Sequence, residues 1–169
     1  MSALPPGISI LDRATELIGR AIRWLALAMV AITLLIVLLR YAFNIGAIPL
    51  QESVMYMHGT LFLLGIPYGL RQGTHVRVDI LYSKMPPAGQ NLIDLAGHVL
   101  FLLPVSVFIL YTSLPYAQAS WRVFEGSSEV GGLPAIFLLK TLIPLTAVLL
   151  LSQACVEITR CVQRLRGQR

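Results

Sequence analysis

Two histidines stand inside long stretches of apolar residues, where an ionisable side chain is rare and usually functional. From facing helices, His58 and His98 could in principle ligate a haem iron. Each lies near the start of its own stretch, and consecutive helices of such a protein run in opposite directions. The two rings would then differ in depth by more than about 10 Å, whereas axial ligands must face each other across one iron. We therefore predict no haem, and nothing else in the chain indicates a cofactor.

Lys140 is the third ionisable residue in such a stretch. Counted from Leu133, it would lie about 10 Å below the surface of the apolar layer. Two interpretations remain open. The side chain could extend outward until the ammonium group reaches water. Alternatively, the ammonium group could meet a carboxylate or carbonyl groups of a partner protein, because no acidic residue of this chain is expected at its depth.

A further group with chemical potential lies between the second and third apolar stretches: Arg71, His75, Arg77 and Asp79. These residue types could suggest catalysis, but no nucleophile, metal-ligand spacing or glycine-rich phosphate loop accompanies them. We predict no catalytic and no metal-binding residue, and hence no enzyme. The four residues are predicted to form a salt-bridged elbow between two helices. Apolar residues that follow would lie on one face of a short helix at the membrane surface: Val78, Leu81, Tyr82 and Met85.

The composition says which elements must position these residues. Of the 169 residues, 12% are charged and 56% are hydrophobic, and the mean hydropathy is +0.75. A typical soluble domain has roughly 25% charged residues. Disordered chains, secreted disulfide scaffolds and most water-soluble enzymes are excluded. Four stretches are free or nearly free of charge: 24–39, 53–70, 95–121 and 130–156. Each can form a membrane-spanning helix, and the first, with 16 residues, can do so because the arginines at its two ends can extend to the membrane surfaces.

We therefore predict an all-α integral membrane protein with a single membrane domain over residues 1–169. Its four transmembrane helices are expected near 23–43, 52–71, 92–118 and 132–157, with a loop over 72–91. Ten of the 13 Lys and Arg residues lie in the N-terminal segment, the central loop and the C-terminal tail. Cytoplasmic loops carry an excess of such residues, so both termini and the central loop are predicted to be cytoplasmic. The basic residues follow the membrane face where anionic lipids would attract them, and nothing indicates nucleic-acid binding.

Residues 8–22 have apolar side chains at helical spacing, with charges on the other faces. They predict an amphipathic helix lying on the inner membrane surface and leading into the first span. An ordinary soluble helix is the alternative, whereas a cleavable signal does not fit the charges in this segment. Cys155 and Cys161 are about 9 Å apart along a helix, too far for a disulfide, so we expect both to be unpaired.

Glycines recur at four-residue spacing in the second stretch, at Gly65, Gly69 and Gly73, with Pro67 among them. Small residues in such a row let the backbones of membrane helices approach closely. The row could serve packing within this protein as well as an external partner, and the sequence does not decide between the two.

These residues together resemble a known family. Glu52 near the start of the second helix, Gly65, Arg71 and the run His75-Val76-Arg77-Val78-Asp79 resemble the small, DctQ-type membrane subunit of tripartite ATP-independent periplasmic (TRAP) transporters. Length, four helices, and Pro134, Lys140 and Pro144 in the last stretch agree. The pair Gly131-Gly132 departs from the pattern.

The resemblance implies a sodium-coupled importer of organic anions, carboxylates or sulfonates, in the bacterial inner membrane. A periplasmic binding protein (DctP type) would capture the substrate, and a large membrane subunit (DctM type) would carry it. The small, multi-pass subunit would brace the scaffold of the large one and help to dock the binding protein. It would contact membrane lipids but bind neither substrate nor sodium. Residues expected to contact a partner or another helix are Glu52, Gly65, Gly69 and Lys140.

The alternative function is a self-contained four-helix transporter or channel that works as a homo-oligomer. No Asp or Glu falls near the middle of any apolar stretch, although an ion-coupled carrier would need such a group to hold its ion. The two functions differ in one observable property, since only the alternative predicts uptake by the purified chain alone in liposomes.

Overall fold

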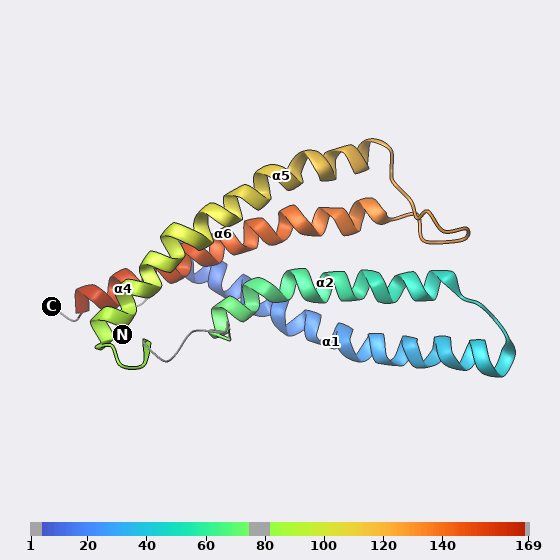
Figure 1. Cartoon of the computed structure of the whole chain (residues 1–169), viewed down its shortest axis with the longest axis horizontal. Coiled ribbons are helices and arrows are strands. Elements are labelled where there is room, and N and C mark those ends of the chain that lie inside the picture. Colours follow the sequence, from blue (N-terminus) through green and yellow to red (C-terminus); the bar gives the residue numbers. More distant parts are fainter. Residues whose placement is uncertain (1–4, 75–81, 168–169) are drawn as a thin grey trace.

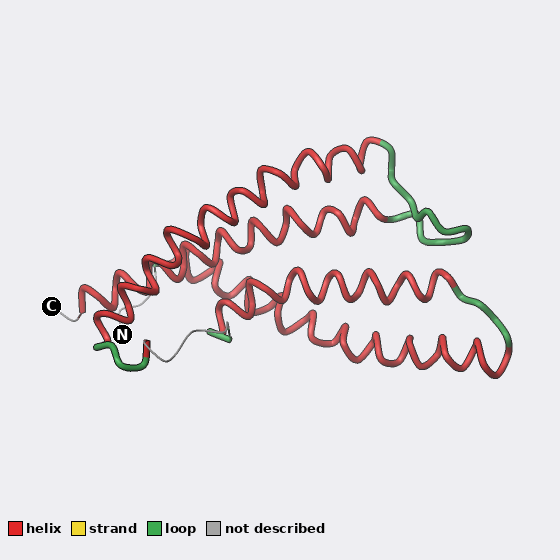
Figure 2. Tube along the Cα trace, in the orientation of Figure 1, coloured by secondary structure: helices red, strands yellow, loops and turns green. Residues whose placement is uncertain are grey.

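The computed structural model describes residues 5–74 and 82–167, and every regular element in this part of the chain is helical. Figures 1 and 2 show the helices and the short loops that join them. The prediction of an all-α fold is confirmed for these residues. The elements are α1 (Pro6–Phe43), α2 (Ile48–Gln72), α4 (Pro87–Gly97), the π-helical turn η1 (His98–Leu102), α5 (Leu103–Arg122) and α6 (Ile136–Gly167).

The helices form four long rods, as predicted, because α4, η1 and α5 follow one another without a break. Three rods are long and apolar enough to cross a membrane: Pro6–Phe43, Pro87–Arg122 and Ile136–Arg166. The helix α2 is not among them, although its 25 residues would extend about 37 Å. Residues 8–22 are helical but belong to the same continuous α1 as the predicted first span. Their position on the membrane surface stays a prediction.

Proline and left-handed residues define the helix ends. A proline stands in the first turn of α1, α2 and α4, where its missing N–H leaves no carbonyl unsatisfied. The helix α1 ends at Asn44, whose φ of 52° turns the chain and whose N–H bonds to the carbonyl of Leu39. Gly73 ends α2 in the same way, with φ of 67°.

The four rods form a layer instead of a closed bundle. Contacts run from α1 to α2, from α2 to α6 and from α6 to α5, while α1 and α5 make no substantial contact. The helix α6 is central, since it also contacts α1, α4 and η1. In Figure 1 the α1–α2 pair and the α5–α6 pair lie close together where α1 begins and α6 ends, and diverge toward the loops at 44–47 and 123–135. We call these two ends of the molecule the terminal end and the loop end.

Small residues allow the closest helix contacts. A Cβ atom added at Gly19 of α1 would lie 2.0 Å from the ring of Tyr68 on α2, and one at Gly59 of α2 would lie 2.7 Å from Leu139 on α6. Neither position can hold a larger residue without displacing its neighbour. The α5–α6 contact is lined by buried small residues of α5, which sequence reasoning missed: Ser106, Ser113, Ala117 and Ser120.

Candidate functional site

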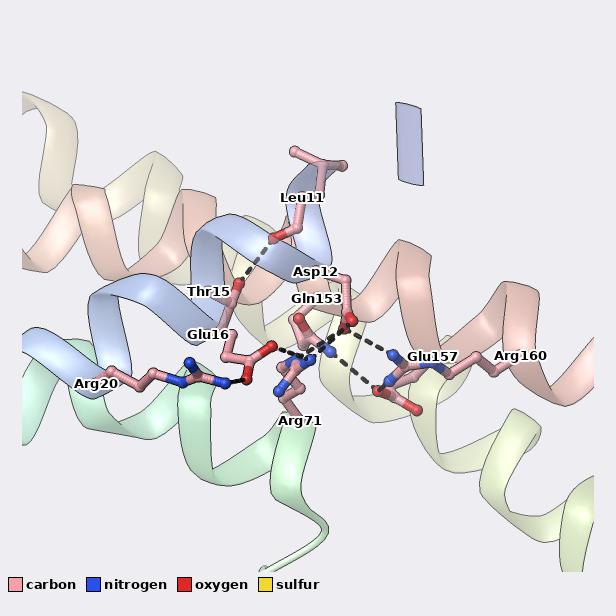
Figure 3. A network of polar contacts seen from close by, with 9 residues as sticks. All are labelled: Leu11, Asp12, Thr15, Glu16, Arg20, Arg71, Gln153, Glu157 and Arg160. Atoms are coloured by element: carbon pink, nitrogen blue, oxygen red, sulfur yellow. Dashed lines mark hydrogen bonds and ion pairs between the residues drawn. The ribbon is translucent and has the colours of Figure 1, made fainter. Parts of the chain in front are cut away.

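Six charged residues meet at the terminal end, where α1, α2 and α6 converge (Figure 3). We call this group the three-helix ionic cluster: Asp12, Glu16 and Arg20 of α1, Arg71 of α2, and Glu157 and Arg160 of α6. Three carboxylates face three guanidinium groups, so the formal charges cancel within the cluster. Except for Arg20, each side chain is at most one quarter exposed.

Arg71 and Asp12 form the centre of this cluster. Arg71 donates from Nε to Asp12 Oδ1 at 3.0 Å and from Nη2 to Asp12 Oδ2 at 3.1 Å, a bidentate pair, and also from Nη2 to Glu16 Oε2 at 2.8 Å. From the third helix, Arg160 Nη2 lies 2.7 Å from Asp12 Oδ1. The carboxylate of Asp12 therefore links all three helices. Planar bidentate pairs are among the stronger and more directional ionic contacts.

Residues on α6 complete the cluster. Glu157 Oε1 accepts hydrogen bonds from Arg160 Nη1 at 2.6 Å and from Gln153 Nε2 at 2.9 Å, and Gln153 is fully buried. Arg20 donates to Glu16 at the exposed rim. Burying charges costs free energy, which is offset only when each charge is paired and hydrogen-bonded. The arrangement meets that condition, so it holds the three helices in one register.

Of the predicted elbow, only Arg71 lies among the described residues. His75, Arg77 and Asp79 lie outside them, so their elbow role stays a prediction. Sequence reasoning missed the actual partners of Arg71. The signal was present, since Asp12, Glu16 and Arg20 recur every fourth residue and thus share one helix face. The predicted surface helix of the central loop also falls mostly outside the described residues; within them, the Tyr82 hydroxyl donates to Asp94 Oδ2 at 2.9 Å.

Glu52 is the centre of a second group, at the loop end. Its Oε1 accepts a hydrogen bond from the Ser127 hydroxyl, and its Oε2 accepts the backbone N–H of Leu133. Both partners belong to the loop 123–135, which Glu52 therefore attaches to α2. A Cβ atom at Gly132 would lie 2.6 Å from Glu52 Oε1, and Gly131 has φ of 80°. The glycine pair that departed from the family pattern thus lets this loop close over Glu52.

Lys140 has an acidic partner within the chain, so the expectation that none lies at its depth is wrong. Its Nζ lies 2.7 and 2.5 Å from the two carboxylate oxygens of Glu125, and 4.4 Å from the centre of the Tyr116 ring. The helix α6 begins only at Ile136, so Lys140 lies about 6 Å into the helix and not deep within it. The loop 123–135 carries Glu125 back to this position.

Glu125 lies in the loop 123–135, outside the helices, and is ionised near neutral pH. The hydrogen bond from Lys140 Nζ holds the pKa of the Glu125 carboxyl below its ordinary value of 4.5. The Lys140–Glu125 pair, together with Glu52, Ser127 and Leu133, is called the loop-end cluster below. It connects the loop 123–135 to both α2 and α6.

Aromatic residues join α5 to α6 beside the loop-end cluster. Trp121 donates from Nε1 to Thr141 Oγ1 at 2.7 Å, and its ring meets Phe137 edge-on with centroids 4.6 Å apart. Phe124 packs edge-on against the same Phe137 ring. These contacts join the loop end of α5 to the first turns of α6.

The glycine row makes no close contact at Gly65, where an added Cβ atom would lie 4.0 Å from Ile22, an ordinary distance. The predicted external contacts of Gly65 and Gly69 stay predictions. Among the described residues, no group of three His, Cys, Asp or Glu side chains could hold a metal ion. In the described part of the chain, Cys155 and Cys161 form no disulfide.

Comparison with known proteins places these features in a family. Residues 29–164 match the family described as tripartite ATP-independent periplasmic transporters, DctQ component. The chain is 26% identical over 125 residues to a TRAP transporter small permease protein of Haemophilus influenzae, covering 69% of this chain and 73% of that protein. It is 29% identical over 97 residues to the C4-dicarboxylate TRAP transporter small permease protein DctQ of Vibrio cholerae, covering 57% of this chain and 40% of that protein. No solved structure matches the chain.

Proposed function

Because the chain belongs to the DctQ component family of TRAP transporters, we propose that it is the non-catalytic small permease subunit of a sodium-coupled importer of organic anions. Membership makes it a transmembrane transport protein of the bacterial inner membrane. The family also implies association with a large membrane subunit and a substrate-binding protein. Carboxylates and sulfonates are the proposed substrates of the whole system, and the Vibrio cholerae relative, a C4-dicarboxylate transporter subunit by name, supports carboxylates.

The observation that carries a bracing role is where the charges lie. No Asp or Glu of the described residues lies near the middle of an apolar stretch, and those in the two clusters are bonded to other residues of this chain. An ion-coupled carrier needs a group within the membrane that can bind and release its ion. The ionic pairs of this chain instead hold its own helices together. Substrate and sodium would therefore pass through the large, DctM-type subunit.

The two clusters account for how such a brace would stay rigid. The three-helix ionic cluster ties α1, α2 and α6 at the terminal end. At the loop end, Glu52 ties α2 to the loop 123–135, and Lys140 ties that loop to α6. A layer held at both ends resists sliding of one helix past the next. We propose that it enlarges the scaffold against which the large subunit moves its cargo.

In this proposal all four rods cross the membrane, α2 included, with the terminal end in the cytoplasm. The distribution of Lys and Arg supports that orientation. The loop end then faces the periplasm, where the loop 123–135 would help to dock the DctP-type binding protein.

The test is reconstitution from separately purified components. A tagged chain should copurify in a one-to-one ratio with a much larger membrane protein. Liposomes that contain both should take up the organic anion only with the binding protein outside and an inward sodium gradient. Liposomes with this chain alone should take up none. Gradient-driven uptake by the chain alone would refute the proposal and support the homo-oligomeric transporter instead.

A further inference from the structure

One face of α2 is covered by no other helix in the part of the chain that the structure describes. Gln51, Met55, His58 and Phe62 follow one another at spacings of four, three and four residues, and all four side chains are exposed. At about 100° per residue they fall within an arc of roughly 60°. Elsewhere around α2, Gly59 faces Leu139 of α6 and Tyr68 faces Gly19 of α1. The exposed face therefore lies apart from the two helix contacts that α2 makes within the chain.

His58 is the residue that makes this face unusual. Its ring stacks on Phe62 with centroids 6.4 Å apart, and it has no hydrogen-bond partner among the described residues. It lies ten residues after Ile48, about 15 Å along α2, and six residues after Glu52, about 9 Å into the predicted span. If α2 crosses the membrane, lipid around His58 would leave two ring nitrogens without partners, which is costly in hydrocarbon. Gln51 avoids this, because it lies near the end of the helix.

The exposed faces of α1 and α5 differ from that of α2, because they are mostly apolar. Exposed residues of α1 include Leu27, Val30 and Leu34, and those of α5 include Val105 and Phe108, all suited to lipid. Polar residues exposed on these rods include Thr33 on α1, and Tyr111 and Thr112 on α5, where Thr112 donates to the carbonyl of Phe108 in its own helix. The hydroxyl of Thr33 on α1 can turn back to a carbonyl of its own helix, and the hydroxyl of Tyr111 on α5 stands at the tip of a long ring. The imidazole of His58 has neither option.

The composition of α2 agrees with this conclusion. Among the described rods, α2 lacks an apolar segment as strong as those of the other three, and His58 is one of the residues that weaken it. A helix of this polarity is stable in a membrane when protein surrounds it, and α1 and α6 cover only part of it. A further protein surface along the exposed face would complete its surroundings.

We propose that Gln51, Met55, His58 and Phe62, which we call the α2 stripe, bind the large membrane subunit. This inference rests on the proposed function. A transmembrane helix of that subunit packs along the stripe, because spacings of alternately three and four residues match the seam between two helices that cross at a shallow angle. The helix of the large subunit presents one hydrogen-bonding group at the depth of His58. The outer faces of α1 and α5 remain in contact with lipid.

Photo-crosslinking in the assembled complex tests the location. A benzoylphenylalanine residue is placed at Phe62, and at Leu34 of α1 and Phe108 of α5 as matched exposed positions. Crosslinks to the large subunit are expected from position 62 and not from the other two. If the subunits copurify but position 62 gives no crosslink, the stripe is not the interface, while the proposed function stands. If no larger protein copurifies, the proposed function itself fails.

Substitution of His58 tests the chemistry. His58→Leu should weaken binding of the purified large subunit in lipid nanodiscs about 3- to 20-fold, the range expected for one hydrogen bond between membrane helices. His58→Gln, which keeps a donor and an acceptor, should retain most of the affinity. Thr33→Val and Tyr111→Phe remove polar groups from the other exposed faces and should change nothing. His58→Leu with unchanged or tighter binding would overturn the role of the imidazole, and unchanged helicity and yield serve as its folding control.

Discussion

Asp12 is the centre of the three-helix ionic cluster, and its replacement by leucine tests whether that cluster holds the layer together. The carboxylate faces Arg71 at 3.0 and 3.1 Å and Arg160 at 2.7 Å, and only 12% of the side chain is exposed. Asp12→Leu leaves two carboxylates facing three guanidinium groups. Removing one partner of a buried ion pair costs about 3–5 kcal/mol. Because Glu16 and Glu157 remain beside the two arginines, we expect about 2–3 kcal/mol here.

A double-mutant cycle separates the pair from its surroundings. Arg71→Met should also destabilise the protein, since Asp12 then keeps only Arg160. The variant with both changes has no unpaired charge from this pair. It should therefore be more stable than the sum of the single effects predicts, by about 1–2 kcal/mol.

The assay is reversible unfolding by SDS from mixed micelles, followed by the fluorescence of Trp24 and Trp121 and by helical circular dichroism. Arg20→Gln is the matched control, since it removes a member of the same cluster whose side chain is 60% exposed. That change should be below about 0.5 kcal/mol. A coupling energy indistinguishable from zero, or an Asp12→Leu effect no larger than that of Arg20→Gln, would refute the role of the cluster.

Two further predictions concern the loop end. Gly132→Ala should open the loop 123–135 and expose it to protease, because the new Cβ atom would lie 2.6 Å from Glu52 Oε1. Gly97→Ala is the control, since a Cβ atom there would have nothing within 4 Å and should not increase cleavage. Equal cleavage of the two variants would contradict the geometry. Glu125→Gln should lower stability near neutral pH by an amount that disappears in acid. The pKa of Glu125 is lower in the folded chain, so its contribution is present above pH 4.5 and is lost as the pH falls through the folded pKa. A difference between the two chains that persisted at low pH would show that the charge is irrelevant.

The rods themselves could be predicted from the sequence, because burying a charge in lipid is so costly that charge-free stretches mark the spans. The helix ends were harder to predict. The last helix begins at Ile136 and not near residue 132, and this difference of one turn changes the surroundings of Lys140 from apolar depth to the reach of Glu125. Counting residues along a helix cannot reveal a loop that folds back, since that return depends on Glu52, Ser127 and two glycines.

The ion-pair partners of the charged residues could not be predicted from the sequence either. Arg71 could be identified as a structural residue by its position in the sequence, but its ligand Asp12 lies 59 residues earlier. Nothing local distinguishes Asp12 from Asp79 as that ligand, because an ion pair between helices depends on which helices lie side by side. Likewise, the sequence does not say that α1 and α5 lie apart, with α2 and α6 between them.

The sequence alone determined that this protein is helical, crosses a membrane and holds no carboxylate at mid-membrane, because each of these follows from where charges are absent. It also carried the family resemblance. The tertiary structure decided which charges neutralise each other, which glycines are needed, and that the rods form an open layer in which the face of α2 that carries His58 is uncovered. Those properties depend on distances between residues far apart in the chain, and the order of residues does not specify such distances until the helices pack.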